Sequence, residues 1–177
     1  MDGAALWEQI LAEPKPMAGN LFMTGVWHYA RGLAVSNLGN RRAANKEHRL
    51  LTKLRKSLPA DYLIGFGTAP DLLQIADLVL SGDIQGKTGD IDLAIASLSR
   101  AARMEDSLRY NEPPDWYFPT RHVLGALLLD GGYASEAAVV YWDDLRKNPG
   151  NGFSLLGLSR AQAAAGDTAS AGATMAK

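Results

Sequence analysis

The sequence predicts an all-α fold built from antiparallel helix pairs. Apolar residues recur three or four positions apart, as on the buried stripe of a helix, whereas runs that alternate apolar and polar residues are short. Small residues also recur at a fixed spacing, because Gly125 is followed by Gly132 seven residues later and by Ala137 after five more. The same spacing occurs at three other places: Gly32, Gly39 and Ala44; Gly82, Gly89 and Ala94; Ser159, Gly166 and Ala171. Four helix pairs with two insertions therefore account for most of the chain.

Five helices are expected in the first part of the chain. They cover residues 4–12, 20–38, 41–57, 71–87 and 91–108. Gly39 ends the second of these helices as a helix-end glycine, and Asp90 is placed to cap the fifth. An insertion at residues 59–74 separates the first two pairs, and its apolar side chains indicate a loop that packs against the helices.

The second insertion, residues 109–117, contains consecutive prolines that exclude a helix. Asp115 is expected to cap a helix that starts at Trp116, with Pro119 in its first turn. This helix is expected to end at Gly131–Gly132.

Three more helices complete the predicted elements. The partner of the preceding helix starts at about residue 134 and is closed by Pro149. Asn151 is expected to cap the next helix, over 152–165. The last helix, 168–176, is rich in alanine, serine and glycine and is therefore expected to be weak.

These elements are expected to form one domain, residues 1–177. The leading segment, 1–16, has the character of the tail of an earlier repeat. The repeats cover about 25–58, 75–108, 118–151 and 152–177.

The composition excludes several classes of function. The formal net charge is −1, so a general basic field for nucleic acid is absent. The chain has no cysteine, which excludes disulfides, thiolate nucleophiles and zinc–thiolate sites. No apolar run reaches the roughly 18 residues that span a bilayer. The first residues lack the pattern of a signal peptide, and the localisation is left open with the cytoplasm as the default.

The third pair carries the clearest resemblance to a known family. It has a small contact residue, a turn glycine, an inward alanine, Tyr141 four residues later and the closing Pro149, and on this pattern the chain resembles the tetratricopeptide repeat family. The first two copies depart from it, since Lys56 and Asp106 stand where the closing proline is expected. The stretches RYNEPPDWYFPTRH and NPGNGFSLLGL also resemble a bacterial subgroup of such proteins without an assigned biochemical role. The resemblance implies a right-handed superhelical solenoid of about 3.5 repeats with a concave groove.

In repeats of this type the first helix of each pair lines the groove, which implies a scaffold that binds a protein or peptide. The expected groove residues are Tyr29, Leu33, Asn37, Val79, Asp83, Lys87, His122, Asp130, Phe153 and Arg160. A second, more polar and aromatic edge is expected at Tyr110, Glu112, Asp115, Trp116 and Arg121. No enzyme activity, cofactor, nucleic acid or membrane is expected. The alternative for the groove positions is that some of them pack under the insertions.

Histidines supply the other hypotheses. His28 and His48 lie on facing helices, where a carboxylate such as Glu47 would complete a metal site. His122 with Glu112 or Asp115 would be a second metal site or a general acid–base pair, although no nucleophile is visible beside it. A third possibility is a self-assembling scaffold, because the ends of a solenoid leave apolar helix faces uncovered.

Charged side chains of the first pair have structural interpretations. Arg31 is expected to form an ion pair with Glu112 or Asp61. The second helix of this pair is expected to present a basic, solvated outer face that carries Arg41, Arg42, Lys46, Lys53, Arg55 and Lys56.

Overall fold

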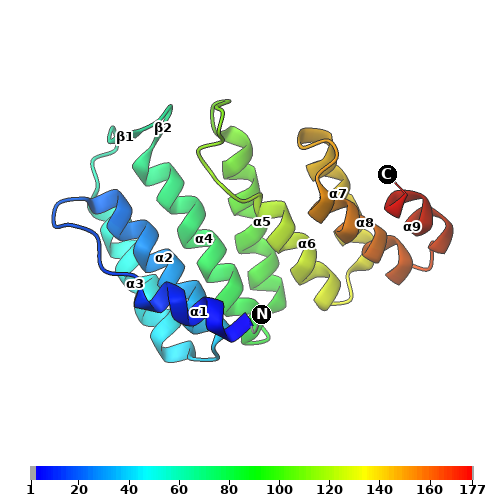
Figure 1. Cartoon of the computed structure of the whole chain (residues 1–177), viewed down its shortest axis with the longest axis horizontal. Coiled ribbons are helices and arrows are strands. Elements are labelled where there is room, and N and C mark those ends of the chain that lie inside the picture. Colours follow the sequence, from blue (N-terminus) through cyan, green and yellow to red (C-terminus); the bar gives the residue numbers. More distant parts are fainter. Residues whose placement is uncertain (1–2, 177) are drawn as a thin grey trace. The chain divides into compact units, whose positions relative to one another are not determined.

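A computed structural model describes residues 3–176, and over these residues the protein is helical apart from one short hairpin (Figure 1). The predicted all-α class is therefore confirmed. The chain divides into two compact units, Met1–Tyr117 and Phe118–Lys177, which we call the N-terminal unit and the C-terminal unit.

The N-terminal unit contains five helices and the hairpin. Their bounds are α1 Gly3–Ala12, α2 Leu21–Asn37, α3 Arg41–Ser57, β1 Leu63–Ile64, β2 Gly67–Thr68, α4 Ala69–Lys87 and α5 Ile91–Ser107. Helix α2 packs against α1, α3 and α4, while α4 also packs against α3 and α5 (Figure 1). Each helix thus contacts its neighbour in the chain, and the first helices of the two pairs contact each other.

The C-terminal unit follows the same rule with four helices. Their bounds are α6 Thr120–Asp130, α7 Ala134–Lys147, α8 Gly152–Ala164 and α9 Thr168–Met175. Successive helices pack together, and α6 also packs against α8. The first helices of the two pairs are again neighbours, and this places α6 and α8 side by side.

One backbone turn closes all four helix pairs. Its glycine has a φ between 79° and 89°, in the left-handed region that a side chain disfavours. The residue after the glycine donates its backbone amide to the carbonyl of the residue four positions before the glycine, at 2.8–3.0 Å. The four glycines are Gly39, Gly89, Gly132 and Gly166.

The small residues of the predicted spacing lie where helices approach most closely. A Cβ at Gly32 would be 2.5 Å from Leu80, and one at Gly82 would be 2.6 Å from Leu98. The alanines of the first three copies, Ala44, Ala94 and Ala137, are fully buried. The prediction that these positions are small because of packing is therefore confirmed.

The hairpin and the start of α4 differ from the prediction. The first insertion folds into two short antiparallel strands, with Leu63 opposite Thr68. Helix α4 begins two residues before the predicted start because Thr68 caps it, its hydroxyl accepting from the amide of Asp71 at 3.3 Å, and Pro70 occupies its first turn.

One predicted helix cap is wrong, and another holds in position alone. Helix α6 begins at Thr120 after Pro119, so Asp115 caps no helix there. Its carboxylate instead accepts from the side chain of Asn111 at 2.8 Å and lies against Gly65 of the hairpin, where it joins the two insertions. Asp90 occupies the N-cap position of α5, as predicted, but its side chain makes no capping hydrogen bond.

Candidate functional site

A cleft of about 440 Å³ opens between α6 and α8 of the C-terminal unit. Four predicted groove residues line it, namely His122, Asp130, Phe153 and Arg160. The other lining residues are Phe118, Val123, Ala126, Leu129, Tyr141, Leu156 and Gly157. The structure thus brings together the groove positions that the sequence predicted for the last two helix pairs.

One end of the cleft is aromatic. The ring centroids of Phe118 and Phe153 lie 6.4 Å apart, and both rings lie within 6 Å of the His122 imidazole, at 5.1 Å and 5.8 Å. The rings of Phe118 and Phe153 meet at 70°, an edge-to-face arrangement that aromatic pairs favour. Phe153 is 70% exposed, so this end presents apolar surface to solvent.

Tyr141 forms the floor of the cleft. Its ring lies between two helices at the points where each carries a glycine, because a Cβ at Gly125 or Gly157 would be 2.5 Å or 2.3 Å from its Cζ. The outer helix α7 thereby sends a ring between α6 and α8. Burial raises the pKa of Tyr141, and the negative charge of Asp130 raises it further. The positive charge of Arg160 lowers the pKa by less than these two effects raise it. The hydroxyl of Tyr141 therefore lies in the field of both charged residues at the other end of the cleft.

A buried polar cluster supports His122 from behind. His122 Nε2 lies 3.1 Å from Asp144 Oδ2, and Ser154 Oγ donates to the same oxygen at 2.6 Å. Asn148 donates to the other oxygen at 3.0 Å. Burial alone would raise the pKa of Asp144, but the hydrogen bonds from His122, Ser154 and Asn148 outweigh it and lower the pKa. The cluster fixes the imidazole and ties α6, α7 and α8 together.

The carboxylate beside the His122 imidazole is that of Asp144, whereas Asp115 bonds to Asn111 and Glu112 to Tyr110 within the N-terminal unit. Ser154 and His122 are both bonded to this carboxylate, so the serine hydroxyl is not held by the imidazole as a nucleophile would be.

Two groove positions predicted in the N-terminal unit are covered. Tyr29 and Val79 are 6% and 3% exposed. The ring of Tyr29 packs against Trp116 of the second insertion with centroids 5.7 Å apart. Burial raises the pKa of Tyr29 strongly. Its interactions with Tyr117 and Asp83 raise the pKa further, by smaller amounts. For Tyr29 the alternative interpretation, burial under an insertion, is the correct one.

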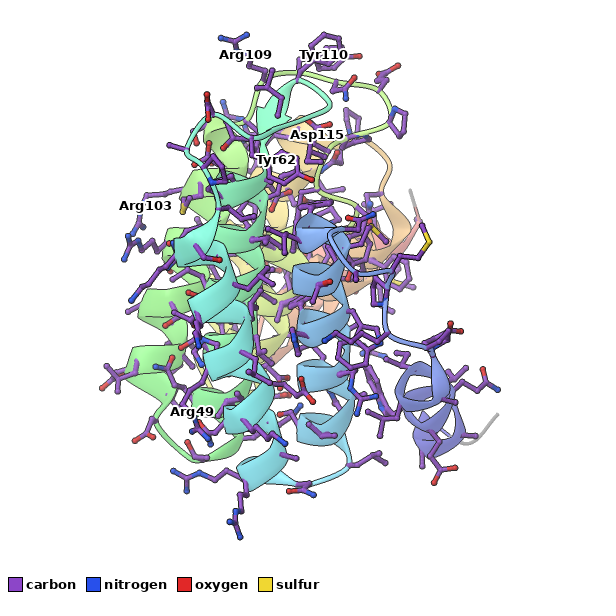
Figure 2. The ribbon with its side chains drawn as sticks, turned by 90° about the vertical axis from the view of Figure 1, so that its left-hand side faces the viewer. Arg49, Tyr62, Arg103, Arg109, Tyr110 and Asp115 are labelled. Atoms are coloured by element: carbon purple, nitrogen blue, oxygen red, sulfur yellow. The ribbon has the colours of Figure 1, made fainter. Side chains whose placement is uncertain are left out.

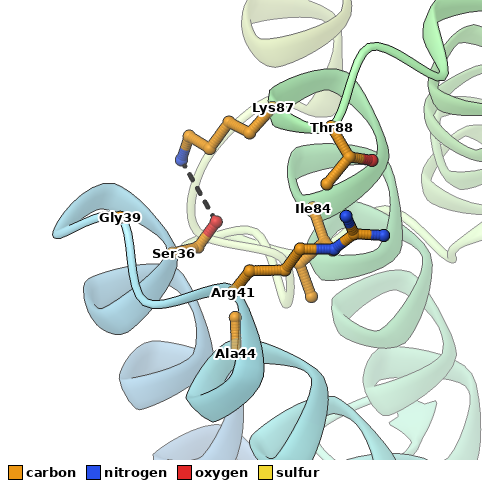
Figure 3. Close-up of a pocket in the computed structure, with 7 residues that line it drawn as sticks. All are labelled: Ser36, Gly39, Arg41, Ala44, Ile84, Lys87 and Thr88. Atoms are coloured by element: carbon orange, nitrogen blue, oxygen red, sulfur yellow. Dashed lines mark hydrogen bonds between the residues drawn. The ribbon is translucent and has the colours of Figure 1, made fainter.

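The polar groove positions of this unit bond to one another. Asp83 accepts from Ser36 at 2.5 Å and pairs with Lys87 at 2.6 Å. Lys87 also donates to Ser36 at 3.4 Å, the bond drawn in Figure 3. Ser36 and Lys87 border a small cavity of about 210 Å³ that Arg41 also lines (Figure 3). Asn37 donates to the carbonyl of Leu33 in its own helix, and Leu33 is half-buried.

Within the N-terminal unit, the members of the predicted polar and aromatic edge differ in exposure. Tyr110 is 84% exposed and bonds to the neighbouring Glu112, whereas Trp116 is 9% exposed. Figure 2 shows Tyr110 at the outer end of the loop that leads to Asp115. Arg121 belongs to α6 of the C-terminal unit and is half-buried.

His28 and His48 bond to different carboxylates. His28 lies 2.6 Å from Glu47, which also pairs with Arg31 at 3.4 Å. His48 lies 3.0 Å from Asp77. Within residues 3–176, no three histidine, cysteine, aspartate or glutamate side chains are grouped as a metal site requires.

Two predictions about arginine side chains in the N-terminal unit are wrong. Arg31 pairs with Glu47 and not with Glu112 or Asp61, because the side chain on the facing helix is nearer. Arg55 turns inward to Asp77 at 3.5 Å and so does not belong to the basic outer face of α3. The remaining members of that face are exposed: Arg41, Arg42, Lys46, Lys53 and Lys56.

Sequence reasoning missed the two aspartates that organise these clusters. Asp77 and Asp144 are 8% and 1% exposed, and each accepts from a histidine and a hydroxyl. The available signal was a carboxylate on the apolar stripe of a helix, which is buried only when it is paired.

Comparison with known proteins identified no relative: no family model, no curated protein and no solved structure matches this chain. None of the helices between residues 3 and 176 has the length and apolar character needed to cross a membrane.

Proposed function

We propose that this chain is a helical-repeat protein of the tetratricopeptide type that binds a protein or peptide segment in the cleft between α6 and α8. The recurrent glycine turn, the buried alanines and the packing of first helices against first helices support such a repeat. A right-handed superhelix of about 3.5 repeats is part of the proposal. So is a function without catalysis or cofactor.

The open, apolar cleft is the observation that carries the proposal. Phe153 and Leu156 of α8 are 70% and 38% exposed on its rim, and apolar surface gathered at one place is a feature of interaction sites. The floor is rigid, because Tyr141 is held between two glycines and His122 is held by Asp144. A preorganised apolar cleft loses little entropy when a partner binds, so a small contact area gives useful affinity.

Selection from a displayed library of random peptides tests this function. Binding peptides are expected, and their affinity should fall about tenfold or more for Phe153→Ala and Leu156→Ala, because the rim supplies the apolar contact. Phe66→Ala is the matched control, since Phe66 is 66% exposed on the hairpin of the N-terminal unit.

Peptides that bind the two cleft variants as tightly as the wild type would refute the proposed site. Failure to select any peptide, together with light scattering that shows concentration-dependent association, would favour self-assembly instead.

A further inference from the structure

The outer side of α3 carries an unbalanced positive charge. The helix has seven lysine and arginine residues and one acidic residue, Glu47, which gives a net charge of +6 in a chain of net charge −1. Glu47 turns inward to His28 and Arg31. One of the cations, Arg55, also turns inward, to Asp77. The exposed side of α3 is therefore basic and has no acidic side chain to balance it.

Five exposed cations form a single row along this helix. They recur at intervals of four and three residues, so they fall within an arc of about 80° and extend over about 21 Å at 1.5 Å per residue. Within the part of the chain that the structure describes, none of the five pairs with a carboxylate. Figure 2 labels the middle member, Arg49. The row, which we call the basic row, consists of Arg42, Lys46, Arg49, Lys53 and Lys56.

The basic row is unfavourable for the helix that carries it. Side chains three or four positions apart on a helix are neighbours, so the row contains four successive like-charge pairs, and such pairs destabilise a helix. Arg42 also stands in the first turn, where the helix dipole favours anions, and this turn holds no acidic residue. Residues that break a local rule of stability without a gain inside the fold are expected at functional sites.

The spacing of the row matches one kind of anionic partner. Adjacent members are about 4.5–6 Å apart along the helix axis. This is less than the Debye length of about 8 Å at physiological ionic strength, so an anion beside the row is attracted by two or more cations at once. Carboxylates three or four residues apart on one face of a partner helix recur at the same intervals. An acidic helix therefore matches the row in both charge and spacing.

Other polyanions and a second copy of the chain match the row less well. Helix α3 has no phenylalanine, tyrosine or tryptophan on which an unpaired nucleic-acid base would stack. A helix that binds a lipid surface inserts its apolar side, whereas the apolar side of α3 packs against α2 and α4. Within residues 3–176 no helix has more than three acidic residues, so another copy offers no matching row.

We infer that the basic row is a docking surface for an acidic protein segment, a helix with carboxylates three or four residues apart along one face. The carboxylates of the partner lie between the cations of the row and relieve their mutual repulsion. The site belongs to α3 of the N-terminal unit, so it is separate from the cleft of the C-terminal unit and does not depend on the function proposed for that cleft.

A synthetic peptide with glutamates at the same intervals as the basic row, in an alanine- and glutamine-rich helix, is the probe. Fluorescence anisotropy of the labelled peptide measures its binding to the full-length protein. Saturable binding is expected at about 20 mM salt, and it should weaken about tenfold at about 200 mM because salt screens each charge. A peptide of the same composition with its glutamates spread around the helix should bind about threefold more weakly or worse.

A double charge reversal tests the row together with its effect on stability. Lys46→Glu combined with Lys53→Glu turns all four like-charge pairs into opposite-charge pairs. Peptide binding should fall about tenfold or more, whereas the urea concentration at half-unfolding should stay equal or rise. The matched control is Arg100→Glu combined with Arg103→Glu, which reverses two exposed charges of α5. It changes the net charge by the same amount and should weaken the peptide less than about threefold.

Several results would overturn this inference. One is equal binding of the peptide by the wild type and the variant reversed at Lys46 and Lys53. Another is an equal loss of binding in the α5 control, because binding would then follow net charge alone. Absence of saturable binding at low salt up to about 1 mM peptide, a weak limit for a specific complex, is a third. Tighter binding of single-stranded DNA or of anionic lipid vesicles at the same salt concentration would show that the partner class is wrong.

Discussion

Tyr141 is the residue on which the geometry of the cleft depends. Its ring fills the space between Gly125 and Gly157, so neither glycine has room for a methyl group. Helices α6 and α8 are therefore held at the separation that one aromatic ring allows. The width of the cleft is set by this ring and by the absence of two side chains.

Gly157→Ala is expected to destabilise the protein by about 1–3 kcal/mol, the usual range for overpacking a well-filled core. The added Cβ would lie 2.3 Å from the Tyr141 ring, and the ring is confined on its other side by Gly125. Urea unfolding measures the change. Gly152→Ala, in the same helix with nothing within 4 Å of its Cβ, should be neutral or slightly stabilising.

Tyr141→Leu provides the second arm of this test, because a smaller side chain should accept the new methyl group. The double variant is expected to lose less stability than the sum of the two single variants. Equal effects of Gly157→Ala and Gly152→Ala would contradict the role assigned to the ring.

Asp144 gives the C-terminal unit a defined dependence on pH. Its hydrogen bonds lower the pKa of the carboxyl in spite of burial, so the folded pKa lies below the unfolded value of about 3.9. A depressed carboxyl contributes stability that is fully present above the unfolded pKa and is lost as pH falls through the folded pKa. Acidification below about pH 4 therefore removes this contribution.

Asp144→Asn is expected to cost about 1–3 kcal/mol at pH 7, since a buried acceptor of three hydrogen bonds loses its charge. The difference from the wild type should narrow below about pH 4 when urea unfolding is repeated along a pH series. Asp143→Asn is the control, because Asp143 is partly exposed and its pair with Arg146 is 3.8 Å long. A difference in the free energy of unfolding between the wild type and Asp144→Asn that stays constant down to about pH 2 would contradict the assignment.

At the scale of elements, the two helices that form the cleft, α6 and α8, differ in how their N-termini are capped. Helix α8 is capped by Asn151, whose side-chain oxygen accepts from the amides of Phe153 and Ser154 at 3.0 Å and 3.2 Å. This cap fixes the start of the helix at Gly152, one residue before the exposed ring of Phe153. Helix α6 has no side-chain cap bond at Pro119, and its start is held by packing and by the proline ring.

Asn151→Ala is expected to lower the free energy of unfolding by about 1 kcal/mol, whereas Asn151→Ser should retain most of it, because serine is an equally good cap. Chemical denaturation of the three proteins gives the comparison. Binding of a selected peptide should weaken in parallel for Asn151→Ala, since Phe153 is the second residue of the helix. An alanine variant as stable as the serine variant would mean that packing alone fixes this end of α8.

For the molecule as a whole, the features that recur in each helix pair could be predicted from the sequence. The spacing of Gly125, Gly132 and Ala137 located the four turns, because only glycine accepts the left-handed turn and only small residues fit the contacts. The same spacing predicted His122 and Phe153 on the inner faces of their helices, and the structure places both on one cleft.

The features that occur in one place alone, such as the packing of an insertion or the partner of a buried charge, could not be predicted from the spacing. Whether a groove position is open depends on where an insertion packs, and nothing near Tyr29 in the sequence announces Trp116 above it. The partners of buried charges were missed for a similar reason. His122 and Asp144 are 22 residues apart on different helices, and the periodicity places each on an inner face without specifying which side chains meet.

The glycine turns have a consequence for how the chain is made. Each turn closes a helix pair through contacts only a few residues apart, and each helix packs chiefly on its neighbours in sequence within its unit. Local contacts of this kind favour rapid folding. A pair can form once its own residues have left the ribosome, and the next pair then folds onto a surface that already exists. Within each unit, the helix pairs are therefore expected to assemble in the order of their synthesis.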